Sequence, residues 1–239
     1  MCYQSVKMHM IGQSAGKSFA YILGVYLGDG CVTRISSGRY EVFRLNTIDR
    51  DFAEATKAAL LDCGAKSVSI STYAVKNSSN PNHALQCSYL AVSGALVTLT
   101  DSKSKLPDMT DWPRDVKLAF IVGLMDSEGF VGANSNPTNR RYYMGFKSCD
   151  PWVPDFIRML ESIGVKIGKV QVEKPYKPGY KPAMRFTIKM QSWIDSGLRF
   201  NIARKQSRVE EWNSAGAYER RAKFPRRLTS ETIRRAPLG

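Results

Sequence analysis

The sequence has few of the residues that build zinc sites or disulfide frameworks. It holds only two histidines, and no two of its cysteines form a CxxC pair. An odd number of scattered cysteines fits a reducing compartment, and it argues against both a zinc site and a disulfide-rich fold. The five cysteines are Cys2, Cys31, Cys63, Cys87 and Cys149.

Long apolar runs and targeting segments are also missing. No uncharged apolar run approaches a membrane-spanning length, and the first residues lack the basic head, apolar stretch and cleavage site of a secretory leader. We therefore expect no membrane association and an intracellular location: the cytoplasm or nucleoid of a bacterium or phage host, or an organelle. The stretch "GQSAGKS" (12–18) has three residues between its glycines. A phosphate-binding loop needs four, so nucleotide hydrolysis is not expected.

Acidic residues are scarce relative to basic ones. The chain of 239 residues has 21 Asp and Glu against 35 Lys and Arg, a formal net charge of +14. Such an excess favours a polyanionic partner, with nucleic acid ahead of a membrane surface, although a merely basic soluble protein is the alternative. The apolar content of 43% and the length predict a folded chain of one large domain or two ordinary ones.

What the sequence does have is a duplication. "YILGVYLGDG" (21–30) and "FIVGLMDSEG" (120–129) are apolar runs that each end in an acid followed by glycine, and the acids, Asp29 and Glu128, are 99 positions apart. Further along, "LLDCGAK" aligns with "LESIGVK" at an offset of 100. Two pairs of segments with nearly equal offsets indicate an internal repeat.

Each repeat shows the same order of expected elements: an apolar helix, strands, a helix, two more strands and a closing helix. In the first repeat the segments are 17–28, a strand within "RYEVFRLNT", 50–64, 67–75, 84–92 and a helix from about 93. In the second they are 115–127, a strand within "RYYMGFKS", 150–164, 168–174, 183–190 and a helix from about 191. Apolar Phe43 and Leu45 alternate with polar residues, as in a half-buried strand. We predict an α+β fold of two similar halves related by a pseudo-twofold axis.

The halves are expected to be joined by a short linker. We place the first half at 1–101, the linker at 102–113 and the second half at 114–217, with a basic C-terminal tail at 218–239. The linker "SKSKLPDMTDWP" ends in proline, which is favourable immediately before a helix. The tail is either a helical arm or a disordered segment.

The two apolar helices carry small residues at matching places. Gly24 and Gly28 lie four apart on one helix face, and Gly123 and Ser127 repeat the spacing. Small residues at this spacing let two helix backbones approach closely, which is a matter of geometry rather than of lipid. If the helices pack on each other, their C-terminal ends lie side by side.

That packing would bring Asp29 and Glu128 together, an arrangement that is electrostatically unfavourable. A helix C-terminus carries partial negative charge, and a second carboxylate nearby raises one of the two pKa values. Divalent cations would cancel both penalties. The carboxylates, with the backbone carbonyls of Gly28 and Ser127 and with water, are hard oxygen ligands suited to Mg²⁺ or Mn²⁺. The alternative is that both acids merely follow helix stops, which two copies in matching registers disfavour.

The segments "ILGVYLGDG" (22–30) and "IVGLMDSEG" (121–129) resemble the two motifs of a single-chain LAGLIDADG homing endonuclease. The resemblance covers most of the chain, apart from about the first dozen residues and the tail. It implies tandem αββαββα repeats that form a DNA-binding saddle. It also implies cleavage of both strands of a long site, leaving short 3′ overhangs. Asp29 and Glu128 match the metal ligands of the family, where Glu is known in the second motif.

The resemblance also implies supporting residues for catalysis. Polar or basic residues from each half line the water pocket around the metals in this family, and by strand position these are Asn46 and Lys147. A basic residue follows the closing helix of each half in relatives. "ARKQSRVEEW" makes it Lys205 in the second half, and in the first half it is Lys103 or Lys105. We favour Lys105 because it directly precedes Leu-Pro.

DNA contacts are expected from outward-facing strand residues and from the hairpin loops. Arg and Lys can read guanine in the major groove, and Asn can read adenine, whereas the remaining contacts would reach phosphates. The candidates are Arg34, Arg39, Arg44, Lys76, Asn77, Arg140, Arg141, Lys174, Lys177, Lys181, Arg185 and Lys189.

Three functions follow as hypotheses. The first is a monomeric endonuclease of the mobile-intron kind, acting with Mg²⁺ or Mn²⁺ on a long, largely asymmetric site in double-stranded DNA. The second is an RNA maturase that assists intron splicing, which could keep both acids. The third is a DNA-binding relative that no longer cuts, against which the retention of both acids and of Lys205 argues. No splice residues of an intein frame the chain, so a free-standing endonuclease is favoured.

Overall fold

The structure is a computed structural model that describes residues 13–35, 40–74, 80–134, 140–175 and 177–223. Along the first half the elements are α2 (Gln13–Leu27), β1 (Cys31–Ile35), β2 (Tyr40–Thr47), α3 (Arg50–Asp62), β3 (Ser69–Tyr73), β4 (Asn82–Cys87) and α4 (Leu90–Thr100). Along the second half they are α5 (Arg114–Glu128), β5 (Gly129–Ala133), β6 (Tyr142–Ser148), α6 (Val153–Ser162), β7 (Ile167–Glu173), β8 (Ala183–Ile188), α7 (Met190–Asp195) and α8 (Ala203–Lys223).

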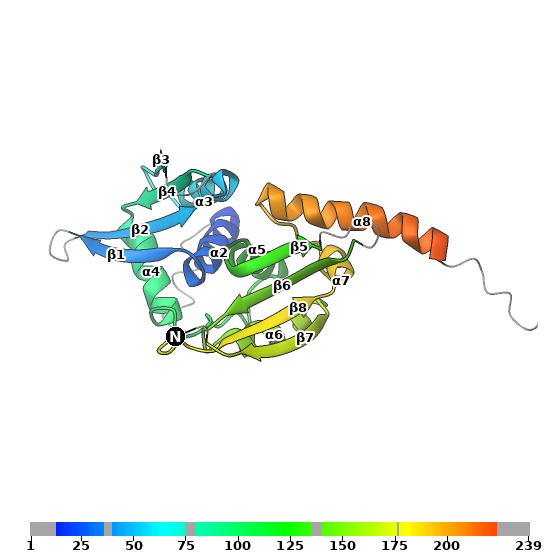
Figure 1. The fold of residues 1–239 in the computed structure, drawn as a ribbon. Helices are drawn as coiled ribbons and strands as arrows, with labels where there is room; N and C mark the ends of the chain where they lie inside the picture. Colours follow the sequence, from blue (N-terminus) through cyan, green and yellow to red (C-terminus); the bar gives the residue numbers. More distant parts are fainter. Residues whose placement is uncertain (1–12, 36–39, 75–79, 135–139, 176, 224–239) are drawn as a thin grey trace, which may run out of the picture.

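The two halves build two sheets with the same topology, as Figure 1 shows. Each sheet has four antiparallel strands, in the orders β1-β2-β4-β3 and β5-β6-β8-β7. Strand register makes positions equivalent: Asn46 pairs with Ala84 in one sheet, and Lys147 pairs with Arg185 in the other. The α+β fold with two related halves is confirmed. Where the halves are divided along the chain stays a prediction.

The expected elements are present, with shifts at some ends. The strand expected over 84–92 ends at Cys87, and the closing helix starts earlier, at Leu90. The reason is the apolar run that follows Tyr89. A short apolar run fits a buried strand and a buried helix equally well, and here Val92 and Leu96 bury one face of a helix. Gly64 and Gly164, both expected to end helices, have φ of +91° and +94°, a left-handed conformation that favours glycine.

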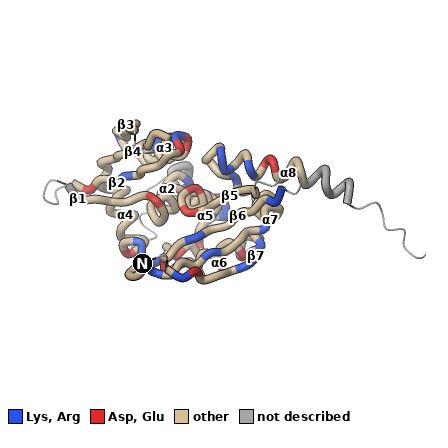
Figure 2. Tube along the Cα trace, in the orientation of Figure 1, with Lys and Arg blue, Asp and Glu red and all other residues tan. Residues whose placement is uncertain are grey.

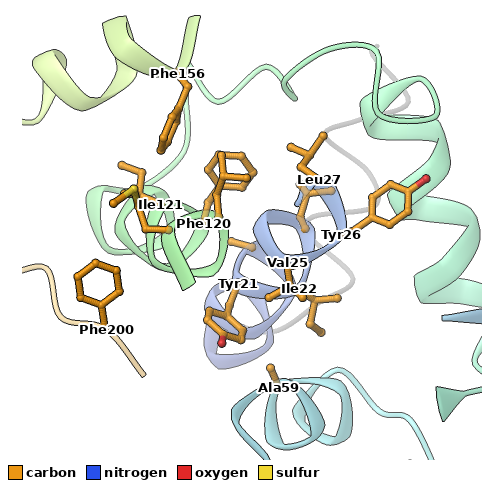
Figure 3. Packing of buried hydrophobic residues seen from close by; sticks show 14 of the residues in the cluster. Tyr21, Ile22, Val25, Tyr26, Leu27, Ala59, Phe120, Ile121, Phe156 and Phe200 are labelled. Atoms are coloured by element: carbon orange, nitrogen blue, oxygen red, sulfur yellow. The ribbon is translucent and has the colours of Figure 1, made fainter. Parts of the chain in front are cut away.

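The core of the molecule lies around the central helices α2 and α5 (Figure 3). Tyr21, Ile22 and Val25 of α2 and Phe120 and Ile121 of α5 are all buried. Each sheet packs one face against helices, because its alternate residues are apolar and buried. These residues are Phe43, Leu45 and Leu85 in the first sheet and Met144, Phe146 and Phe186 in the second. Lys and Arg occur along strands of both sheets (Figure 2); among them Lys147 is exposed and Arg44 is half-buried.

The last described element is α8, which contacts β5 of the second sheet and then extends beyond it (Figure 1). It runs to Lys223, so the first residues of the basic tail are helical, and 224–239 lie outside the described residues. Among the helices that the structure describes, none is long and apolar enough to cross a membrane.

Candidate active site at the ends of the central helices

Glycines bring the two central helices into backbone contact. A Cβ atom at Gly24 would overlap the carbonyl oxygen of Phe120, and one at Gly123 would overlap the carbonyl oxygen of Tyr21. Only residues without a side chain allow this approach. Near the C-terminal ends, a Cβ at Gly28 would lie 2.9 Å from Ser127 Oγ and 3.2 Å from Glu128 Cγ. The helix ends therefore lie side by side.

Asp29 and Glu128 share this end of the helix pair. Glu128 is the last residue of α5 and is half-buried, and Asp29 follows α2 by two positions and is exposed by surface area. Loss of hydration, together with the negative charge of Asp29, raises the pKa of Glu128 to about 7. Loss of hydration also raises the pKa of Asp29. The electrostatic penalty expected from the sequence is thus present in the folded chain.

A lysine binds the carbonyl groups at the end of each central helix. Lys205, only 3% exposed, donates from Nζ to the carbonyl oxygens of Met125 (3.0 Å) and Asp126 (2.5 Å) in α5. Lys103 donates from Nζ to the carbonyl oxygen of Gly28 (2.8 Å), immediately after α2. A cation at a helix C-terminus offsets the partial negative charge there. Burial lowers the pKa of Lys205 to about 8 and lowers that of Lys103.

Lys103, and not Lys105, is the first-half lysine at this site, which corrects the preference drawn from the sequence. Lys105 is exposed. The backbone turns at Asp101, Ser102 and Lys103, whose φ values of 46°, 53° and 73° are all left-handed. Three such residues in a row, none of them glycine, cost about 1–3 kcal/mol each and persist only where the surroundings hold them. The turn places Lys103 Nζ 5.2 Å from the centre of the Tyr26 ring as well as on Gly28.

Sequence reasoning missed the buried acid Asp126, which is 1% exposed. Its carboxylate accepts hydrogen bonds from the Tyr21 hydroxyl (3.1 Å) and from Asn201 Nδ2 (3.0 Å), so it joins α2, α5 and the segment before α8. Burial raises its pKa to about 6. The available signal was an aspartate inside an apolar motif, at the position where the first motif has Leu27.

A second polar contact joins the halves beside Lys205. Arg204 Nε and Nη2 donate to the two carboxylate oxygens of Asp49 at 2.6 and 2.7 Å. The equivalent acid in the second half, Asp150, instead accepts from the Ser148 hydroxyl at 2.6 Å. The charge of Asp150 contributes to the raised pKa of Glu128. The surroundings of the two central acids are therefore not identical.

The predicted pocket residues Asn46 and Lys147 occupy equivalent positions on exposed sheet surface. Lys147 Nζ donates to Glu173 Oε2 at 2.6 Å, so its nearest described partner is an acid on β7 rather than one of the central acids. A role for either residue in a water pocket stays a prediction.

The predicted DNA-contact residues fall into groups. Arg39, Lys76 and Asn77 lie outside the described residues. Three arginines form ion pairs: Arg34 with Glu41, Arg140 with Glu211, and Arg185 with Glu173. Arg44 is half-buried, and within the described chain its buried Nε has no hydrogen-bond partner. The remaining candidates are exposed: Arg141, Lys174, Lys177, Lys181 and Lys189.

The donor set fits a magnesium-type ion bound together with a substrate. Among the described residues, no group of three or more His, Cys, Asp or Glu side chains could hold a metal. Mg²⁺ is usually held by one or two carboxylates, water and substrate phosphates rather than by a closed protein cage. Asp29 and Glu128 supply such a pair. The carbonyl of Gly28 already accepts a hydrogen bond from Lys103, which makes it a weaker candidate ligand than the two acids.

Comparison with known proteins agrees with this architecture. Residues 16–95 match the family model of a LAGLIDADG-like domain. An uncharacterized protein of Methanocaldococcus jannaschii is 32% identical over 130 residues, which is 54% of this chain, and the match spans only 44% of that protein.

Solved structures show the same fold. The homing endonuclease I-WcaI bound to its DNA recognition sequence aligns with a TM-score of 0.53 at 8% identity, covering 81% of this chain and 86% of that one. A variant of the homing endonuclease I-DmoI aligns with a TM-score of 0.51 at 15% identity, covering 77% of this chain and 94% of that one. Full-length DUF199/WhiA from Thermotoga maritima aligns with a TM-score of 0.50 at 11% identity, covering 88% of this chain and 68% of that one. Residues 16–95 therefore resemble a LAGLIDADG-like domain, and the two halves of the chain share the fold of these structures.

Proposed function

We propose that the protein is a site-specific, metal-dependent endonuclease of the homing type that cuts both strands of double-stranded DNA. The observation that carries the proposal is the paired helix end: Asp29 and Glu128 lie there together, and Lys103 and Lys205 bind the helix carbonyls beside them. The net charge of +14 suits a DNA partner. Among the structural neighbours, a variant of I-DmoI was solved in complex with its target DNA in the presence of manganese.

In this proposal Asp29 and Glu128 would be the protein ligands of Mg²⁺ or Mn²⁺. The bound metal would lower the pKa of a water molecule and stabilise the leaving 3′ oxygen of an in-line displacement. The chain's own contribution is to fix the two carboxylates by the backbone contact of the helices. Glu128 must lose its proton to act as a ligand, which its pKa of about 7 permits at neutral pH. Lys103 and Lys205 keep positive charge beside the phosphates.

The finer features of the proposal come from the family resemblance. They are a long and largely asymmetric target, short 3′ overhangs, a monomeric enzyme and an origin in a mobile intron. One chain already contains both halves of the saddle, so a second copy is not needed to form the pair of acids. If the reading frame lies inside an intron, the intact exon junction is the expected target.

The test is cleavage of that junction, or of a site selected from random duplexes, by the purified chain with Mg²⁺. We expect both strands to be cut. Asp29→Asn should lower the cleavage rate by about a thousandfold or more while DNA binding survives. Lys105→Met is the matched control, because Lys105 is exposed and its variant should cut normally. Cleavage that persists in Asp29→Asn, or that needs no divalent ion, would contradict the proposal.

A DNA-binding relative that does not cut is the second candidate. It is favoured by the likeness to DUF199/WhiA, which has this fold and is not named as an endonuclease. Sequence-specific duplex binding by the wild-type chain with no cleavage in Mg²⁺ or Mn²⁺ would support it. Binding of intron RNA with no duplex cleavage would support the maturase instead.

A further inference from the structure

A cluster of four side chains lies on the polar face of the second sheet: Phe130, Lys147, Glu173 and Arg185. Glu173 is its centre, and its Oε2 accepts from Lys147 Nζ at 2.6 Å and its Oε1 from Arg185 Nη1 at 3.3 Å. The guanidinium of Arg185 also lies over the Phe130 ring, 4.7 Å from its centroid. Arg185 is therefore held from two sides, by a carboxylate and by an aromatic face. We refer to these four residues as the Arg185 cluster.

Within the described residues, the first sheet has no such cluster, although its strands have the same register. The positions equivalent to Phe130, Lys147, Glu173 and Arg185 are Cys31, Asn46, Tyr73 and Ala84. None of the four is Lys, Arg, Asp or Glu. The two sheets thus differ at these four positions: the second sheet has two cations and an acid there, whereas the first sheet has no Lys, Arg, Asp or Glu.

The Arg185 cluster is close to the candidate active site. Phe130 is two positions after Glu128, at the start of β5, and Lys147 is three positions before Asp150, whose charge raises the pKa of Glu128. A DNA duplex whose phosphates reach Glu128 would present nearby base pairs to this part of the sheet. The cluster is therefore placed against the part of the target near the cut.

The chemistry of the cluster suits a base edge better than a phosphate. Hydrogen bonding from Lys147 lowers the pKa of Glu173, which keeps this carboxylate ionised at neutral pH. An ionised carboxylate repels phosphate, yet it can accept from the amino group of cytosine. In the part of the chain that the structure describes, Arg185 makes a hydrogen bond only through Nη1. Nε and Nη2 remain for O6 and N7 of a guanine, the geometry of arginine-guanine recognition.

Restraint of the Arg185 side chain favours DNA binding, because an unrestrained arginine loses about 2 kcal/mol of rotamer entropy when it is fixed on a partner. Ion pairing to Glu173 and stacking on Phe130 remove part of that loss before DNA arrives. Other exposed candidates, such as Arg141 and Lys181, show no comparable support among the described contacts, and they suit phosphates.

We propose that Arg185, positioned by Glu173 and Phe130, reads a guanine in the half of the target that faces the second sheet. Glu173 is then a positioning residue for target specificity. The first sheet lacks the Arg185 cluster, so the half-site that faces it has no counterpart of this guanine. The inference rests on the proposed function, since it requires sequence-specific binding of duplex DNA.

The experiment is binding-site selection from a randomised duplex library, using the full chain with Asp29→Asn so that bound DNA survives. We expect one guanine, in one half of the selected site only, to be preferred by about tenfold or more. Added to this chain, Arg185→Ala should reduce that preference to less than about twofold. Glu173→Gln should reduce it several-fold while total affinity stays equal or rises, because a negative charge has been removed.

The matched control is Glu41→Gln in the first half. Glu41 also accepts from an arginine at 3.3 Å, Arg34 Nε, but on the other sheet, so its variant should leave the guanine preference unchanged. Circular dichroism of each variant checks that it is folded, and Arg185→Lys provides a second test because it keeps the charge and loses the two-donor geometry.

Two results would overturn the inference alone. One is a selected site with no guanine whose preference depends on Arg185. The other is a uniform loss of affinity for all sequences in Arg185→Ala with a shallower salt dependence, which marks a phosphate contact. If the library yields no preferred duplex at all, the proposed function fails and the inference with it.

Discussion

The two halves of the chain agree at the centre of the molecule and differ away from it. The strand orders, the glycine contacts, the two acids and the two lysine-carbonyl contacts are repeated. The hydrogen bonds of two equivalent pairs are not: Asp49 accepts from Arg204 but Asp150 from Ser148, and Tyr21 donates to Asp126 whereas Phe120 has no hydroxyl. The polar faces of the two sheets differ as well. Under the proposed function, the features that would act on each DNA strand are duplicated, whereas the features that could distinguish two half-sites have diverged.

The strongest way to break the symmetric centre is to force the helices apart. Gly24→Val should destabilise the fold by about 5 kcal/mol or more, because the new side chain would overlap the backbone of α5 at Phe120. Gly94→Ala is the control, since nothing lies within 4 Å of its added Cβ in α4. It should stabilise by about 0.5–1 kcal/mol through helix propensity. Urea denaturation measures both, and equal stabilities would contradict the backbone contact.

The buried acid that only the second half possesses should have the next largest effect. Asp126→Ala should cost about 3 kcal/mol, because it takes an acceptor from the Tyr21 hydroxyl and from Asn201 and removes an acidic charge near Lys205. Asp126→Asn, which keeps an acceptor, should cost less. Thermal unfolding compares the variants. An unchanged midpoint for Asp126→Ala would show that the network contributes nothing.

The repeated lysine contact can be tested at Lys103, which the sequence offered as the alternative to Lys105. Lys103→Met should slow cleavage by about a hundredfold, because it removes a cation from beside the acids and leaves the carbonyl of Gly28 without its donor. Lys105→Met should cut at the wild-type rate. Single-turnover rates on each labelled strand are the measurement. A larger effect from Lys105→Met would restore the original preference.

The smallest expected effect concerns pH and Glu128. Its pKa is raised to about 7 in the folded chain against 4.5 for an unperturbed glutamate. A raised folded pKa favours the protonated form, so stability is full below about pH 4.5 and declines as pH rises through 7. After allowance for solvent screening, the loss is about 1–2 kcal/mol.

Glu128→Gln should therefore unfold at higher urea than wild type at pH 8 without divalent ions, and at nearly the same urea at pH 4. Wild-type cleavage should rise with pH through about 7, as the ligand form of Glu128 accumulates. A stability difference that does not depend on pH would show that desolvation of the carboxylate is not its cause.

The sequence was sufficient to predict the centre of the molecule. The duplication, the helical period of the two motifs and the spacing of Gly24, Gly28, Gly123 and Ser127 led directly to a helix pair with two acids at one end. These features are local in the sequence and occur twice, so residue spacing alone is enough to predict them.

The parts of the site that the sequence left open or did not reveal depend on contacts between distant segments or on unusual backbone conformation. Lys103 reaches the site through three consecutive left-handed residues without glycine, which no propensity signals. Asp126 is satisfied by Tyr21 and Asn201, 105 and 75 positions away. The Arg185 cluster joins side chains from four strands, and its members could be named only one by one as candidate DNA contacts or pocket residues before the register was known.

The contact between Tyr21 and Asp126 has a consequence for how such a chain could assemble incorrectly. By the internal alignment, Tyr21 corresponds to Phe120 and Asp126 to Leu27. Two copies of the first half would face the tyrosine hydroxyl with leucine, and two copies of the second would face the buried aspartate with phenylalanine. Either homotypic pairing removes the buried hydrogen bond between the tyrosine hydroxyl and the aspartate carboxylate. The two halves have become complementary rather than interchangeable, so one chain's first half selects a second half over a duplicate of itself.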